Sequence, residues 1–196
     1  MAELIRETVF PSEILVSENE LGARLGRKVS LEDAEIKTIL DELYKVANPV
    51  FVATRVNILG NKEGIVTFEG FLVESSALSR YFEGSCETFL FMATLGTEVD
   101  RLIAKKRVRS LSDGFIYDAV ASAVIEAVCD AAEKKICGSV ITKNRFSPGY
   151  ADCPLSVQKE IVKLLSADKY AGIKLLDSLL MSPMKSVSAF IAIRGK

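Results

Sequence analysis

The chain has 196 residues, of which 49% are hydrophobic and 26% are charged, and its formal net charge is −1. This composition excludes a generally disordered chain. Because the net charge is near zero, the chain has no overall positive field that would attract nucleic acid or an anionic membrane. The sequence contains no histidine, which excludes Ser-His-Asp triads, Cys-His dyads and histidine metal sites. We therefore expect no nucleic-acid partner, no membrane segment and no metal site.

The chain length predicts one domain over residues 1–196. Its four cysteines have no C-x-x-C spacing and are expected to be free thiols in a reducing compartment; they are Cys86, Cys129, Cys137 and Cys153. The first residues carry charges and no long apolar run, so no signal peptide is recognised. These features predict a cytoplasmic protein.

The predicted elements of the first half are mostly strands with short helices between them. A helix follows Ser30, where Ser30 and Asp33 are spaced as a capping box, and it ends at Asn48 before Pro49. Strands are expected over 50–59, 65–73 and 87–95, with a turn over 60–64 between the first two. Short helices are expected from Ser75 to Phe82 and over 97–107.

The longest predicted helix covers residues 112–137, with Gly138 at its C-terminal end. Two prolines and a glycine predict a loop over 143–154, an amphipathic helix follows over 155–165, and strands are expected over 174–181 and 186–193. Strands in pairs, interrupted by helices of uneven length, favour an α+β fold with an antiparallel sheet over a regular βαβ array.

A polar row follows the long helix at intervals of four residues. Its members are Asp118, Ser122, Glu126 and Asp130, and the residues between Ala119 and Cys129 are otherwise apolar. The row can be a solvated stripe on a buried helix. Alternatively, Glu126 is buried among small apolar residues and requires a cationic partner such as an amine or sulfonium.

The loop before the amphipathic helix carries groups suited to a small zwitterionic ligand. Arg145 can grip a carboxylate at two points, Gly149 allows close approach of the backbone, and Tyr150 offers a flat apolar face. The other interpretation is a surface turn followed by a helix start. The serines near Ser186 likewise either bind a ligand or close a turn.

A basic run lies near the end of the helix expected over 97–107. It consists of Arg101, Lys105, Lys106, Arg107 and Arg109. It either docks an acidic partner or forms the solvated face of a helix.

The C-terminal third resembles a known family. The strings RFSPGYADCPLSVQKEIVKLL and GIKLLDSLLMSPMKSVSAFIAI resemble the activation domain of cobalamin-dependent methionine synthase. The resemblance is strongest over 112–193 and poor over 1–111. It implies an α+β fold with a twisted antiparallel sheet and flanking helices, and it implies binding of S-adenosylmethionine.

The resemblance also implies roles for individual residues. Arg145 is similar to the arginine that holds the ligand carboxylate, and Glu126 to the helix glutamate that faces the polar end of the ligand. Tyr150 is similar to the tyrosine at the edge of the corrin and methyl-donor site, which makes it the catalytic candidate. The remaining candidates for binding S-adenosylmethionine are Ser147, Gly149, Ser186 and Ser188.

The sequence has no recognisable cobalamin module, no zinc-homocysteine module and no histidine to ligate cobalt. The resemblance therefore implies the reactivation subunit of a split methionine synthase. Such a subunit would be part of a methyltransferase without complete activity alone. Its expected partners are a cobalamin-bearing methionine synthase subunit and a flavodoxin- or ferredoxin-like electron donor. The alternatives are a module that caps a corrinoid protein without S-adenosylmethionine, and a reactivator of a different corrinoid methyltransferase.

Overall fold

The computed structural model describes residues 3–194. Its centre is a six-stranded sheet in the order β4-β3-β2-β5-β8, with β1 paired to β2 beside this path. Every pairing within the sheet is antiparallel. The strands are β1 (Leu4–Thr8), β2 (Val50–Lys62), β3 (Ile65–Phe68), β4 (Phe71–Glu74), β5 (Glu87–Thr94) and β8 (Ser186–Ile193). A separate hairpin joins β6 (Lys174–Leu175) to β7 (Met181–Ser182).

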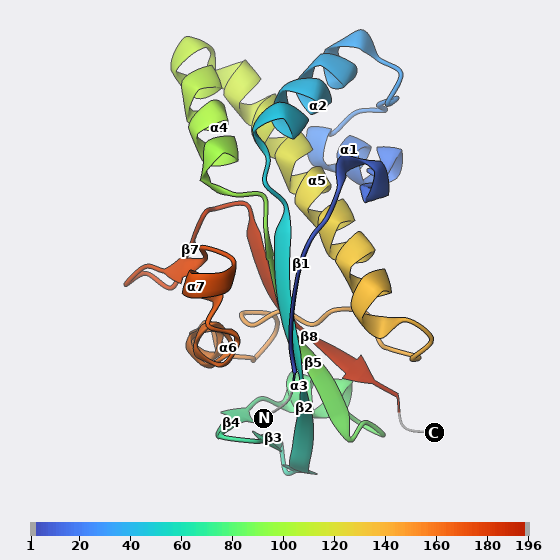
Figure 1. Cartoon of the computed structure of the whole chain (residues 1–196), viewed down its shortest axis with the longest axis vertical. Coiled ribbons are helices and arrows are strands. Elements are labelled where there is room, and N and C mark those ends of the chain that lie inside the picture. The colour runs from blue at the N-terminus through green and yellow to red at the C-terminus, as the bar shows by residue number, and fades with distance from the viewer. Residues whose placement is uncertain (1–2, 195–196) are drawn as a thin grey trace.

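The helices gather around this sheet as Figure 1 shows. They are α1 (Glu18–Leu25), α2 (Ala34–Val46), α3 (Ser76–Tyr81), α4 (Thr97–Arg109), α5 (Leu111–Cys137), α6 (Gln158–Leu165) and α7 (Ala167–Tyr170). Helix α5 is 27 residues long, and Ser110 caps its start by accepting a hydrogen bond from the Asp113 amide at 3.2 Å. The expected α+β fold with an antiparallel sheet and flanking helices is confirmed.

The two faces of the sheet pack against different helices, because side chains alternate along a strand. In β8, Ala189 and Ile191 belong to the core beneath α5, whereas Phe190 and Ala192 belong to the core that includes α6 residues. Figure 1 shows α5 on one side of the strands and α6 with α7 on the other. Each fully buried Ile or Phe side chain contributes roughly 1.5–3 kcal/mol of transfer free energy. This alternation fixes which residues of β8 can reach a site on α5.

Strand β2 is longer than expected and serves two neighbours on the same edge. Its first half pairs with β1, and its second half pairs with β3, with a register shift between Ile58 and Gly60 within that pairing. The turn expected over 60–64 is therefore confined to Glu63 and Gly64. Strand β1 and helix α1 were not predicted from the sequence.

Two further expectations need correction. Helix α2 begins at Ala34 rather than directly after Ser30. Only half of the expected capping box forms, because the Ser30 amide donates to Asp33 Oδ2 at 3.3 Å while the Ser30 hydroxyl donates to Glu18. The strand expected over 65–73 is divided by a turn in which Gly70 has a φ of +97°. A left-handed φ suits glycine and ends the strand there.

The C-terminal elements also differ in detail from the prediction. The segment expected as one strand over 174–181 contains a turn between the two-residue strands β6 and β7. The helix expected over 155–165 begins as a 3₁₀ turn at Leu155–Val157 before α6. No helix among residues 3–194 combines the length and apolar character that a membrane span requires.

Candidate functional site

The polar row on α5 meets two cations that come from distant parts of the chain. Lys185 Nζ lies 2.8 Å from Ser122 Oγ and 3.0 Å from Asp118 Oδ2. Arg145 pairs with the next two members of the row, Glu126 and Asp130. Glu126 therefore has the cationic partner that one of the two sequence interpretations required. The row is not a stripe that only faces water.

Three carboxylates of α5 surround the Arg145 guanidinium. Its Nη2 lies 3.1 Å from Glu126 Oε2 and 2.8 Å from Asp130 Oδ1, and its Nη1 lies 2.9 Å from Glu133 Oε2. The Arg145 side chain is 17% exposed, whereas that of Asp130 is 62% exposed. Because acids outnumber the base here, the site has an excess of negative charge and favours a ligand that carries a positive charge.

The guanidinium stays charged in this position. Burial alone would lower the pKa of Arg145, but the nearby carboxylates of Asp130 and Glu133 raise that pKa above its ordinary value. The Cys129 thiol is fully buried, and burial raises its pKa, so it is neutral beside the ion pairs. The charges at the site are therefore those of Arg145 and the three acids.

A short extended segment holds Arg145 against the edge of the sheet. The Phe146 amide donates to the Phe190 carbonyl at 2.9 Å, and the Phe190 amide donates to the Phe146 carbonyl at 2.8 Å. Phe146 packs into the core on the α6 face. Since neighbouring side chains of an extended segment point to opposite faces, Arg145 and Ser147 are directed toward α5.

These groups line one cavity of about 370 Å³. Small-molecule sites commonly have volumes of roughly 300–1,000 Å³. The lining residues are Glu126, Asp130, Glu133, Asn144, Arg145, Ser147 and Val187. The structure thus brings three of the expected site residues together, namely Arg145, Glu126 and Ser147.

Gly149 and Tyr150 lie just beyond the cavity and do not line it. Gly149 has a φ of +87°, its amide donates to the Cys153 carbonyl, and an added Cβ would come within 3.1 Å of Leu155. The Tyr150 side chain is 68% exposed and meets the Phe146 ring edge-on at 5.6 Å between centroids. Tyr150 therefore presents most of its surface to solvent.

Asp152 anchors this loop to the start of α3. Its carboxylate accepts hydrogen bonds from the Ser75 hydroxyl at 2.6 Å, the Ser76 amide at 2.8 Å and the Ala77 amide at 3.0 Å. These hydrogen bonds, that of Ser75 first, lower the pKa of Asp152 to about 2. The loop that carries Gly149 and Tyr150 is therefore fixed at both ends.

Ser186 and Ser188 are placed away from this cavity. They share the face of β8 that holds Phe190, opposite Val187, which lines the cavity. The Ser186 hydroxyl lies 2.8 Å from Thr94 Oγ1 and 2.7 Å from the Pro183 carbonyl. Ser188 is buried, and its hydroxyl has no hydrogen-bond partner within residues 3–194.

Three further residues line the cavity without having been predicted from the sequence, namely Glu133, Asn144 and Val187. Glu133 could have been found, because it lies seven residues after Glu126 and so shares the same helix face. Asn144 and Val187 carry no comparable signal, since their positions depend on how the extended segment joins β8.

Ion pairs neutralise much of the basic run near the end of α4. Arg101 pairs with Glu98, and Lys106 Nζ lies 2.6 Å from Glu42 Oε2. Arg107 lies 3.8 Å from Asp118. Most of these charges are therefore engaged within the fold itself.

Comparisons with known proteins agree with this architecture. A model of the vitamin B12 dependent methionine synthase activation domain matches residues 91–195. The chain is also similar to the crystal structure of the MetH reactivation domain bound to AdoHcy. That similarity has a TM-score of 0.69 and 18% identity, and it covers 97% of this chain and 78% of that one. The search of curated proteins finds no match. Because the family model covers more than half of the chain, this protein belongs to the activation-domain family of vitamin B12 dependent methionine synthase.

Proposed function

We propose that this chain binds S-adenosylmethionine in the cavity between α5 and Arg145 and presents its methyl group to a cobalamin held by a partner protein. The observation that carries this proposal is the cluster of Arg145 with Glu126, Asp130 and Glu133 at the wall of one cavity. In a family member, this combination of charges suits a molecule with a carboxylate, an ammonium and a sulfonium.

The chemistry of the residues fits such a ligand. A guanidinium can bind the ligand carboxylate at two points. For that, Arg145 must give up one of its own carboxylates, and Asp130 is the most exposed of the three. The released carboxylate is then available for the ammonium or sulfonium of the ligand, so that no charge is left without a partner.

In this proposal the chain contributes positioning and exclusion of water rather than bond chemistry. S-adenosylmethionine supplies the methyl group, and a flavodoxin- or ferredoxin-like protein supplies the electron that restores the partner's cobalamin. Arg145 binds the carboxylate of the ligand, and Glu126 supplies negative charge for its ammonium and sulfonium. Tyr150 is exposed, does not line the cavity, and in this proposal meets the corrin. Holding donor and acceptor together removes much of the entropic barrier to transfer.

We further propose that the chain acts as the reactivation subunit of a split methionine synthase. Titration calorimetry with S-adenosylmethionine tests binding first. The wild type should bind S-adenosylmethionine. Arg145→Ala should raise the dissociation constant at least tenfold, because a charged hydrogen-bonding partner contributes about 1.5–3 kcal/mol. The control Arg101→Ala removes an exposed arginine and should bind normally.

A pull-down with a cobalamin-loaded methionine synthase lacking its own activation domain tests the partner. Capture that increases with S-adenosylmethionine supports the reactivation role. The wild type could instead capture the methionine synthase while calorimetry detects no binding of S-adenosylmethionine at millimolar concentration. That result would favour a capping module. Binding of S-adenosylmethionine with no capture would favour a different corrinoid client.

A further inference from the structure

A second cavity lies where α5 stops short of the end of the sheet. Helix α5 ends at Cys137, and residues 139–141 then turn back over the ends of β5 and β8. The space enclosed there is about 540 Å³, and it shares no lining residue with the cavity at Arg145. It is therefore a separate site rather than an extension of the first.

The walls of this cavity are mainly apolar. Ile193, 6% exposed, comes from β8, while Val140 and Ile141 overhang from the loop and are 38% and 69% exposed. The loop is held in place because the Arg194 amide donates to the Ile141 carbonyl at 2.9 Å. Covering accessible apolar side chains around a concave space with an apolar group is favourable, because it removes their surface from water.

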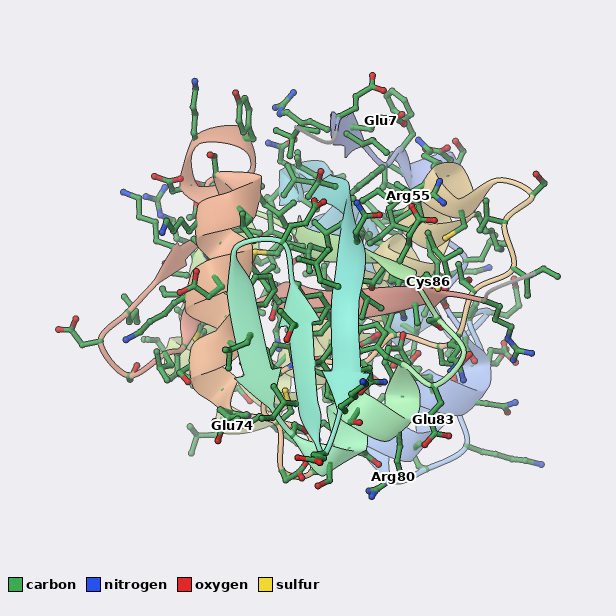
Figure 2. The ribbon with its side chains drawn as sticks, turned by 90° about the horizontal axis from the view of Figure 1, so that it is seen from below. Glu7, Arg55, Glu74, Arg80, Glu83 and Cys86 are labelled. Carbon is green, nitrogen blue, oxygen red and sulfur yellow. The ribbon has the colours of Figure 1, made fainter. Side chains whose placement is uncertain are left out.

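The charged groups at this cavity are two arginines and one glutamate. Arg55 is paired with Glu87, so the carboxylate is already neutralised. Arg194 is exposed, and it forms no ion pair with the residues that the structure describes. Figure 2, which views the molecule from below, shows Arg55 and Cys86 close together on the same side of the ribbon. The surplus guanidinium gives the apolar cavity a positive charge.

From this combination we infer that the cavity between residues 139–141, the middle of β2, the start of β5 and the end of β8 binds an amphipathic organic anion. The apolar body of the ligand lies against Val140, Ile141 and Ile193, and its carboxylate pairs with Arg194. The inference does not depend on S-adenosylmethionine binding, because the two cavities have different walls.

The chain carries its own reporter for this site. Cys86 lines the cavity and is the exposed cysteine, whereas Cys129, Cys137 and Cys153 are buried. The uncharged reagent N-ethylmaleimide should therefore modify Cys86 selectively, and an occupant of the cavity should slow that reaction. Octanoate is the anionic probe, and octylammonium is the matched cation of the same chain length.

Saturable protection of Cys86 by octanoate, several-fold at millimolar concentration, is the expected result, with little protection by octylammonium. Arg194→Gln removes the Arg194 guanidinium, and Ile141→Glu places a carboxylate at the mouth. Each should raise the half-saturating octanoate concentration at least fivefold. Both positions are exposed, so the melting temperature should be unchanged. The matched control is Leu111→Glu, at an exposed residue of the first turn of α5. In this variant octanoate should protect Cys86 as it does in the wild type.

Three outcomes would overturn the inference. They are no protection of Cys86 by octanoate, equal protection by the anion and the cation, and protection unchanged in both Arg194→Gln and Ile141→Glu. Because the measurement needs neither S-adenosylmethionine nor a partner protein, its failure would leave the proposed reactivation function untouched.

Discussion

Arg145 Nη2 lies 3.1 Å from Glu126 Oε2, although 19 positions separate the two residues in the sequence. The contact joins the extended segment beside β8 to the middle of α5. Carboxylates outnumber the guanidinium at this contact, so two ligands that differ by one positive charge should bind there with different affinities. A sulfonium ligand should gain from the negative charge, whereas the uncharged thioether left after methyl transfer should not.

We therefore expect Glu126→Gln to weaken binding of S-adenosylmethionine more than binding of AdoHcy. The difference should be up to about tenfold, or ~1.4 kcal/mol, and it should shrink as salt screens the site. Titration calorimetry of both ligands at low and high ionic strength measures it. Glu98→Gln, which removes an exposed acid on α4, is the control. Equal losses for the two ligands would mean that Glu126 acts on their common part.

Tyr150→Ala should separate transfer from binding. The side chain is 68% exposed, so its removal should change the free energy of unfolding by less than about 1 kcal/mol. If Tyr150 meets the corrin, the rate of methyl transfer to a cobalamin-bearing partner should fall at least tenfold while the dissociation constant for S-adenosylmethionine changes little. Tyr150→Phe keeps the ring and should retain most of the rate. A parallel loss of binding in Tyr150→Ala would assign the residue to the ligand instead.

Asp152 should give the protein a measurable dependence on acid. Hydrogen bonds from Ser75, Ala77 and Ser76 lower its pKa to about 2 from an ordinary value of 3.8. The folded state therefore binds this proton more weakly than the unfolded chain. The stabilisation is fully present above about pH 4 and is lost as the pH falls toward 2.

The measurement is the melting temperature of the wild type and of Asp152→Asn across this pH range. The wild type should be the more stable protein at neutral pH, and the difference should narrow between pH 4 and pH 2. Asp168→Asn on α7, an acid for which the structure gives no hydrogen bond from α3, should show no such narrowing. A constant difference across the range would contradict the anchoring role.

Gly114→Ala should destabilise the fold even though alanine is the better helix former. An added Cβ would lie 2.6 Å from Arg107 Cβ and 2.7 Å from Arg107 Cα, so α4 and α5 would have to separate. Overpacking of this kind costs about 1–3 kcal/mol, against a helix-propensity gain of about 1 kcal/mol. Chemical denaturation should therefore show a net loss. Ser112→Ala, on the exposed surface of the same helix, should be neutral or slightly stabilising.

The sequence predicted elements whose signals are local. The alternation of Val187, Ala189, Ile191 and Ile193 predicted β8, and the long apolar run with Gly138 at its end predicted α5. Strand β1 was missed because Leu4–Thr8 is short and carries two charged residues. It is a strand because β2 offers it an edge. The break at Gly70 was missed because one glycine within an apolar run does not by itself indicate a turn.

The candidate site was predictable to the extent that it follows helix spacing and loop chemistry. The spacing by four residues placed Glu126 and Asp130 on one face, and the need of Glu126 for a cation was predicted, whereas Arg145 was expected to grip the carboxylate of a ligand. The separation of Ser188 from this cavity could not be read from the sequence. It follows from which face of β8 packs against α5, and that depends on pairing between distant strands.

Helix α5 also fixes the spacing and the face of the side chains that hold the two cations. It carries Asp118 and Ser122, which engage Lys185, and further along the same face Glu126 and Glu133, which engage Arg145. Inserting a single residue between Ser122 and Glu126 would rotate everything beyond by about 100° and release one cation while sparing the other. A whole-turn insertion would restore the face but displace Glu126 by about 5.4 Å along the helix axis, so the length of this stretch should be fixed.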